Sequence, residues 1–137
     1  TNLDLGCGAY SYIKSVGFDI SEKMLQNNEN LISKVVGDVE KNLPFKDNEF
    51  DSVTAIFLLN YVKNYEKLFA EISCVLKSGG IFMMVLSAVP IKKWHQRQQV
   101  NDFSVKEWKE ALEKSFKVKF YSKEDLYFLR CTKAKSY

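Results

Sequence analysis

Residues 3–8 read Leu-Asp-Leu-Gly-Cys-Gly, an apolar run that ends in two glycines one residue apart. This pattern predicts a buried parallel strand that breaks into a tight turn. Glycine suits such a turn because it tolerates unusual backbone angles and, having no Cβ, lets a ligand lie against the main chain. The stretch therefore predicts an α/β fold with a nucleotide-like ligand at this turn.

An acid follows the next short run in the same way. Residues 15–18, Ser-Val-Gly-Phe, predict a second strand, and Asp19 comes directly after it. A carboxylate at this place can accept two hydrogen bonds from a ribose diol. The connection between the two strands is shorter than the dozen or more residues that parallel strands usually need. We therefore expect a single helical turn near residues 11–14, or a crossover from which residues are missing.

The rest of the chain alternates short apolar runs with helical patterns, which is typical of a parallel sheet covered by helices. The pattern predicts a helix over residues 22–28 capped by Ser21, strands over 34–37, 50–57 and 81–87, and helices over 64–77 and 104–115. Gly79 and Gly80 are expected to end the helix over residues 64–77. The final runs, from Phe116 and from Leu126, are expected to pair as an antiparallel hairpin joined by residues 122–125.

Residues 43–45, Leu-Pro-Phe, lie in the polar stretch 40–49, which we expect to be a loop. The triplet can either plug the core or form the wall of a site for a flat ring. Because Asp38 comes just before it, we favour the wall.

The length of 137 residues predicts one domain, residues 1–137, with a core that needs no disulfides. The chain starts inside its first strand with no initiator Met, so we expect further residues of the natural chain before Thr1. No apolar run approaches the ~20 residues of a membrane span, and no signal-peptide pattern is present. These features predict a cytoplasmic protein without a membrane span.

The three cysteines are Cys7, Cys74 and Cys131, and they share no metal-ligand spacing. We interpret them as reduced thiols and expect no metal site. Cys7 lies in the glycine turn, where we favour a small packing residue over a reactive thiol.

Charge is uneven along the chain. Residues 1–87 hold 8 Lys and Arg against 11 Asp and Glu, whereas residues 88–137 hold 12 against 6. The last third is therefore able to meet an anionic partner such as RNA, a phosphorylated metabolite or a membrane surface. We favour a solvated basic face, because the lysines are scattered along the sequence.

Six motifs, in this order, resemble the class I S-adenosylmethionine-dependent methyltransferases, and more narrowly their small type 11 branch, which includes ubiquinone-biosynthesis-type enzymes. They are the stretch 3–8, Gly-Phe-Asp-Ile-Ser at 17–21, Gly-Asp-Val-Glu at 37–40, Leu-Pro-Phe at 43–45, Phe-Asp-Ser-Val at 50–53 and Val-Leu-Lys-Ser-Gly-Gly at 75–80. The resemblance covers residues 1–87 well and the remainder in outline. It implies a Rossmann-like, seven-stranded, mostly parallel sheet with helices on both faces and an antiparallel C-terminal hairpin.

The resemblance also implies S-adenosylmethionine as the cofactor. Its site would consist of Asp4, Gly6, Cys7, Gly8, Asp19, Ile20, Asp38, Val39, Phe57 and Leu58. In this site Asp19 would take the ribose hydroxyls, and Asp38 would accept the adenine amino hydrogen. Gly6 and Gly8 would let the methionine part and the ribose approach the backbone, with Asp4 supporting the turn and the amino group.

The acceptor implied by the resemblance is a small molecule, because the chain carries no large insertion or added domain. No Asn-Pro-Pro-aromatic run follows the fourth strand, which argues against DNA. The acceptor site would include Asn60, Tyr61, Trp94 and His95. His95 is either a catalytic base or, as we favour, a surface histidine, and Asn60 and Tyr61 either face the methyl group or close a turn. No catalytic residue is assigned, because an activated methyl group needs a base only when the acceptor has a high pKa.

Three alternatives remain open at this stage. A methyltransferase-like subunit that binds a partner without catalysis is suggested by the short first crossover and by Tyr10, which stands where many family members have a third glycine. A tRNA or RNA methyltransferase is suggested by the basic last third. A nicotinamide-dependent oxidoreductase would share the glycine turn and the ribose acid, but its fingerprint needs a glycine where this chain has Ser11. The sequence does not indicate an oligomeric state.

Overall fold

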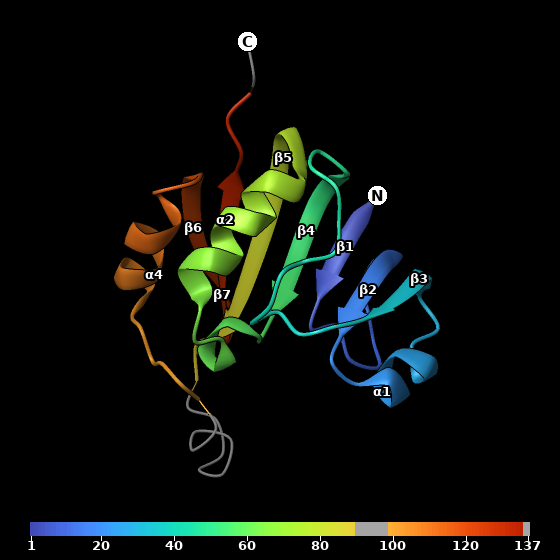
Figure 1. Cartoon of the computed structure of the whole chain (residues 1–137). Coiled ribbons are helices and arrows are strands. Elements are labelled where there is room, and N and C mark those ends of the chain that lie inside the picture. The colour runs from blue at the N-terminus through green and yellow to red at the C-terminus, as the bar shows by residue number, and fades with distance from the viewer. Residues whose placement is uncertain (90–98, 136–137) are drawn as a thin grey trace.

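The computed structural model describes residues 1–89 and 99–135, and it contains one seven-stranded sheet of order β3-β2-β1-β4-β5-β7-β6 (Figure 1). Pairing is parallel throughout the first five strands and antiparallel on both sides of β7. The strands are β1 (Asn2–Leu5), β2 (Ser15–Asp19), β3 (Leu31–Val36), β4 (Phe50–Ile56), β5 (Leu76–Ser87), β6 (Lys117–Lys123) and β7 (Leu126–Thr132). The predicted mostly parallel sheet with an antiparallel C-terminal hairpin is confirmed.

Two helices, α1 (Glu22–Asn27) and α4 (Val105–Leu112), begin where their capping residues predict. In α1 the Ser21 side chain accepts a hydrogen bond from the Met24 backbone N–H. In α4 Ser104 and Glu107 form the reciprocal capping box that the sequence indicates. The other helices among the described residues are the 3-10 turn η1 (Leu59–Tyr61) and α2 (Tyr65–Val75).

The main core lies on the face of the sheet covered by α2 and α4, which stand in front of the strands in Figure 1. Side chains that alternate along the central strands point into it and are fully buried: Leu3, Leu5, Val53, Ala55, Phe82 and Met84. Phe69 of α2 and Trp108 of α4 meet there, with ring centroids 6.0 Å apart. The two helices are thus held on the sheet by one aromatic cluster.

The opposite face is covered by α1, which packs against β2 and β3. The C-cap residue of this helix, Asn28, donates to Ser11 at 3.0 Å, and Ser11 hydrogen-bonds Asp4, which points away from the main core. Polar side chains continue across this face, because the Asn2 amide donates to Ser15 at 2.9 Å and to Thr54 at 3.0 Å. Helices therefore lie on both faces, as expected.

The structure corrects three local predictions. No helix forms in the first crossover, residues 6–14, all of which are described, so the expected single helical turn is wrong and the alternative of missing residues stays a prediction. Gly79 and Gly80 lie inside β5 and do not end a helix, because α2 stops at Val75 and the chain becomes extended at Leu76. The C-terminal hairpin turns through only two residues, with Glu124 at a φ of 55°, and not through four.

Two residues of the Leu-Pro-Phe triplet, Leu43 and Phe45, pack on the core, contrary to the wall that we favoured, while Pro44 is exposed. Leu43 is buried in the core cluster. The ring of Phe45 packs edge-on against Phe18 and Phe50, with centroids 5.9 and 5.2 Å away. Leu43 and Phe45 thus serve as core residues of the loop before β4.

Within the described residues, every helix is too short or too polar to cross a membrane.

Candidate functional site

The carboxyl ends of β1, β2 and β3 lie side by side and carry the predicted cofactor residues. The Gly6 N–H donates to the Phe18 carbonyl at 2.7 Å, and the Gly37 N–H donates to the Asp19 carbonyl at 3.0 Å. These backbone bonds bring the glycine turn next to the end of β2, and the end of β2 next to Asp38. The three features that the sequence separates by up to 32 positions therefore form one continuous edge.

Asp19 holds the glycine turn in place. One carboxylate oxygen accepts from the Gly8 N–H at 2.8 Å, and the other accepts from the Ser21 N–H at 2.8 Å. A carboxylate has about four lone-pair positions, so each oxygen can still accept one more hydrogen bond. Asp38 is similar, since one oxygen accepts from the Glu40 N–H at 2.9 Å. Both acids are fixed by the backbone with acceptor capacity to spare.

The two glycines of the turn differ in what lies above them. Both have a positive φ, 63° at Gly6 and 60° at Gly8, which other residues rarely adopt. A Cβ on Gly6 would come within 2.8 Å of a methyl group of Leu58, whereas the closest atom to a Cβ on Gly8 would be the Met24 methyl at 3.5 Å. Leu58 therefore covers Gly6, and the backbone at Gly8 is open.

Apolar side chains around this edge are exposed to solvent. Ile20, next to Asp19, is 70% exposed, and Phe57, at the end of β4, is 46% exposed; Val39 is half-buried. Phe57 has a φ of 56°, a conformation that is strained for a bulky residue and that is common at functional sites. A carboxylate acceptor, an open glycine backbone and exposed apolar side chains together suit the ribose and the flat base of an adenosine.

Asp4 and Cys7 support the turn from inside. Asp4 is buried, and burial raises its pKa, an effect that hydrogen bonds with Ser11 and Thr54 partly offset. Burial, together with the nearby charges of Asp4 and Asp19, raises the pKa of Cys7 to about 11. Cys7 is therefore a neutral thiol, as expected for a packing residue.

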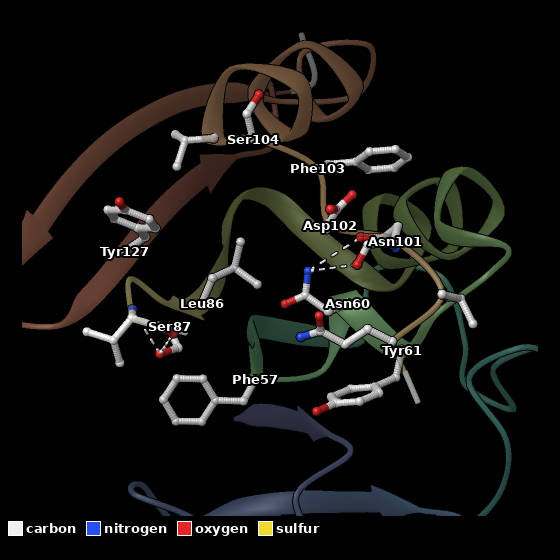
Figure 2. Close-up of a pocket in the computed structure, with 14 residues that line it drawn as sticks. Phe57, Asn60, Tyr61, Leu86, Ser87, Asn101, Asp102, Phe103, Ser104 and Tyr127 are labelled. Carbon is white, nitrogen blue, oxygen red and sulfur yellow. Dashed lines mark hydrogen bonds between the residues drawn. The ribbon is translucent and has the colours of Figure 1, made fainter. Parts of the chain in front are cut away.

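A cleft of about 1050 Å³ opens beside this edge, at the ends of β4 and β5 (Figure 2). Four of its lining residues are aromatic: Phe57, Tyr61, Phe103 and Tyr127. The other lining residues are Asn60, Leu86, Ser87, Val89, Gln99, Val100, Asn101, Asp102, Ser104 and Val105. The lining thus combines aromatic and aliphatic side chains with amide, hydroxyl and carboxylate groups.

The cleft is closed on one side by a tether between Asn60 and the segment before α4. The Val100 N–H donates to the Asn60 carbonyl at 2.9 Å. The Asn101 side chain donates to the Leu59 carbonyl at 3.1 Å and lies 3.4 Å from the Asn60 amide (Figure 2). These bonds hold the segment that carries Asp102 and Phe103 against η1, where both residues line the cleft.

The predicted site residues divide into two adjoining groups. Leu58 lies on the glycine turn, while its neighbour Phe57 lines the cleft together with Asn60 and Tyr61. Asn60 and Tyr61 belong to the 3-10 turn η1, as one of the two roles considered for them expects, and both also line the cleft. Trp94 and His95 lie outside the described residues.

The sequence did not point to the lining residues that follow position 98. Asn101, Asp102 and Phe103 lie in a stretch without apolar periodicity, and Tyr127 appears only as a strand residue of the hairpin. One sequence signal could have found Asn101, Asp102 and Phe103. The capping box at Ser104 fixes where α4 begins, and these residues come directly before it.

Comparison with known proteins shows similarity over most of the chain. Residues 3–84 match the family model of the type 11 methyltransferases, described as "Methyltransferase domain". Demethylmenaquinone methyltransferase of Staphylococcus saprophyticus is 35% identical over 105 residues, which covers 64% of this chain and 45% of that protein. The ubiquinone/menaquinone biosynthesis C-methyltransferase UbiE of Francisella tularensis subsp. novicida is 36% identical over 108 residues, 65% of this chain and 43% of that protein. The chain spans less than half the length of these curated relatives.

A solved structure shows the same fold. One chain in the complex between the Trm112 methyltransferase activator of Haloferax volcanii and a methyltransferase superposes with a TM-score of 0.84, covering 97% of this chain and 82% of that one at 20% identity. The match of well over half the chain to the family model, on a sheet of this topology, establishes the assignment. The chain belongs to the type 11 methyltransferase-domain family, within the class I S-adenosylmethionine-dependent methyltransferases.

Proposed function

We propose that the protein transfers the methyl group of S-adenosylmethionine to a small, flat acceptor bound in the cleft. One observation carries this proposal: Leu58 lies on the glycine turn and its neighbour Phe57 lines the cleft, so the two sites adjoin. A cofactor held along the strand ends would present its sulfur end to the mouth of the cleft.

The cofactor site consists of the residues that edge the sheet. Asp19 accepts the two ribose hydroxyls through the lone pairs that the backbone leaves unused. Asp38 would accept a hydrogen bond from the adenine amino group, and Ile20 and Val39 would lie beside the base. Gly8 would let the ligand lie against the main chain, because the nearest atom to a Cβ there is the end of the flexible Met24 side chain, at 3.5 Å.

The bound cofactor supplies a methyl group that is already activated as a sulfonium. The chain has to align the acceptor and exclude water from the reaction. The aromatic rings of Phe57, Tyr61 and Tyr127 would hold a flat acceptor by stacking, and the hydrogen bonds of Asn101 hold the segment before α4 at the cleft. Asp102 is the carboxylate in the described cleft, and it can accept a proton from an acceptor hydroxyl.

Two relatives are named as methyltransferases of quinone biosynthesis. A quinone precursor has a flat ring with hydroxyl groups, and the mixture of aromatic and amide groups in the cleft suits this chemistry. We therefore propose a hydroxylated aromatic ring as the acceptor class.

Calorimetry tests the cofactor site. We expect the intact protein to bind S-adenosylmethionine, and the Asp19→Ala variant to bind it at least tenfold more weakly, because hydrogen bonds to a charged acceptor contribute about 1.5–3 kcal/mol each. Asp47→Ala is the matched control. Asp47 is an exposed carboxylate in the loop before β4, not at the carboxyl end of a strand, so this variant should bind as the wild type does. Circular dichroism checks that each variant is folded. Absence of binding by the intact protein would refute the proposal.

RNA is a second candidate acceptor, favoured by the charge of residues 88–137, which carry 12 Lys and Arg against 6 Asp and Glu. Transfer of a labelled methyl group to the RNA fraction of an extract, and not to its small-molecule fraction, would favour it.

A partner-bound subunit without catalysis is the third candidate. The helix-free first crossover supports it, and the structural relative assembles with an activator. Copurification of a partner without methyl transfer to any extract component would favour it.

A further inference from the structure

The chain between β4 and α2 joins the cofactor edge to the cleft. Leu58 covers Gly6 of the glycine turn, and the residues that follow form η1, in which Asn60 and Tyr61 line the cleft. A shift of this segment would therefore move the cleft relative to the cofactor edge. Group transfer is sensitive to such a shift, because a misplacement of about 1 Å can cost roughly 100-fold in rate.

Glu40 holds the far end of this segment. It lies in the chain that leaves β3 and runs towards η1 and the start of α2 (Figure 1). Its Oε1 accepts from the Lys63 N–H at 3.1 Å and from the Asn64 N–H at 2.9 Å, and its Oε2 accepts from the Lys63 N–H at 3.0 Å. Asn64 is the N-cap of α2, and its own side chain forms no capping bond. A carboxylate from a distant loop is thus the acceptor at this helix start, where the helix dipole favours a negative charge.

The backbone of Glu40 is tied to the cofactor edge. Its N–H donates to a carboxylate oxygen of Asp38 at 2.9 Å, and the Lys41 N–H donates to the Asp38 carbonyl at 3.0 Å. Asp38 in turn follows Gly37, whose N–H donates to the Asp19 carbonyl at 3.0 Å. The turn that carries the proposed adenine acceptor is therefore connected, through one side chain, to the segment that forms the cleft.

On the other side of η1, the same backbone holds the segment before α4. The Asn101 side-chain amide donates to the Leu59 carbonyl at 3.1 Å and to the Val62 carbonyl at 3.3 Å. The Val100 and Asn101 N–H groups donate to the Asn60 carbonyl at 2.9 and 3.3 Å. Asn60 and Asn101 face each other at this junction (Figure 2). A contiguous series of hydrogen bonds thus runs from the turn after β3 to the wall of the cleft, and such networks can couple two sites.

We propose that Glu40 is a positioning residue, which sets the acceptor cleft in place when the cofactor binds at Asp38. This inference rests on the proposed function, because it takes the ligand of Asp38 to be the cofactor. A ligand bonded to Asp38 restrains the turn that carries Glu40. Glu40 then restrains the start of α2 and η1, and η1 restrains residues 100–103. The acceptor therefore meets a cleft that the bound cofactor has already ordered.

A purely capping role for Glu40 predicts a different behaviour. A cap stabilises α2 to the same extent with and without the cofactor, whereas a positioning residue makes the segment before α4 respond to the cofactor. Val100 and Asn101 report this response, because their N–H groups bond to Asn60 and to no predicted cofactor residue.

Hydrogen exchange followed by mass spectrometry tests the inference with S-adenosylhomocysteine, the demethylated cofactor, and needs no acceptor. In the wild type, a saturating concentration of this ligand should slow exchange at Val100 and Asn101 about fivefold or more, the lower end of the usual coupling between sites. In Glu40→Ala the ligand should change exchange there by less than about twofold. Slower exchange at residues 6–8 shows in each variant that the ligand is bound.

Two further variants separate the hydrogen bonds of Glu40 from its charge and from non-specific effects. Glu40→Gln keeps one oxygen that can accept from both N–H groups, as Oε1 does, so it should restore most of the response. Glu29→Ala removes an exposed carboxylate that lies before β3, so it should respond as the wild type does. Circular dichroism checks that each variant is folded.

The inference is wrong if the wild type binds the ligand without slower exchange at Val100 and Asn101. It is also wrong if Glu40→Ala responds in full or loses the ligand altogether, or if Glu40→Gln or Glu29→Ala loses the response as Glu40→Ala does. In each of these cases residues 6–8 of the wild type still report a bound ligand, so the proposed function stands. Unchanged exchange at residues 6–8 of the wild type would instead refute the proposed function, and this inference with it.

Discussion

At the scale of single residues, Asp19 explains how a short glycine turn keeps its shape without a following helix. Its carboxylate accepts hydrogen bonds from Gly8 and Ser21, so it fixes the turn from the end of the neighbouring strand. The position of Asp19 was predictable, because an acid after a short apolar run is a sequence pattern. Its bond to Gly8 was not predictable, because it depends on how β1 and β2 pair.

The cysteines offer a direct test of this packing. At about pH 8 we expect iodoacetamide to modify Cys74, which is exposed, and to leave Cys7 and Cys131 unmodified in the folded protein. Burial raises the pKa of Cys131 to about 12 and that of Cys7 to about 11, so very little thiolate is present in either. Mass spectrometry of the alkylated peptides measures this, and urea should expose all three thiols. Alkylation of native Cys7 as fast as Cys74 would contradict the packing described here.

At the scale of elements, the sequence was informative wherever a local cause fixes a boundary. Ser21 and Ser104 predicted the helix starts because a capping side chain acts within three residues. The predicted end of α2 was wrong because Gly79 and Gly80 serve β5. A Cβ on Gly80 would come within 2.7 Å of the Lys77 carbonyl and 3.1 Å of the Asp51 carbonyl, so close backbone approach requires glycine there.

The cap of α4 matters for the cleft as well as for the helix. Ser104 accepts from the Glu107 N–H at 3.2 Å, and Ser104 itself lines the cleft. We expect Ser104→Ala to lower the free energy of unfolding by about 1 kcal/mol and Ser104→Thr to restore most of it. Denaturant unfolding measures both. Ser122→Ala, at an exposed position in β6, is the control and should change stability by less than about 0.5 kcal/mol. An equal effect of both alanine variants would show that the cap contributes nothing.

At the scale of the whole molecule, the order of the motifs predicted the fold better than any single motif. Each strand ends in a residue that suits a ligand, and parallel strands bring such ends to one edge. The cleft was harder to predict. Its walls come from β4, β5, β7 and the segment before α4, and these meet only because β7 inserts between β5 and β6. That long-range arrangement leaves no local pattern in the sequence.

The aromatic cluster in the core predicts which substitution lowers the stability of the fold most. Its aromatic cluster lies on one face of the sheet, where Phe69 contacts Tyr65, Phe82 and Trp108 at centroid distances of 6.0 to 6.1 Å. We expect Phe69→Ala to cost about 3–5 kcal/mol, because the cavity would separate α2 from both α4 and β5. A domain of this size has roughly 5–15 kcal/mol of stability, so the urea midpoint should fall by about 1 M or more. Phe120→Ala is the control, since that ring is 41% exposed and should cost about 1 kcal/mol or less. If both variants unfolded at the same urea concentration, the one-sided cluster would not be what holds the helices on the sheet.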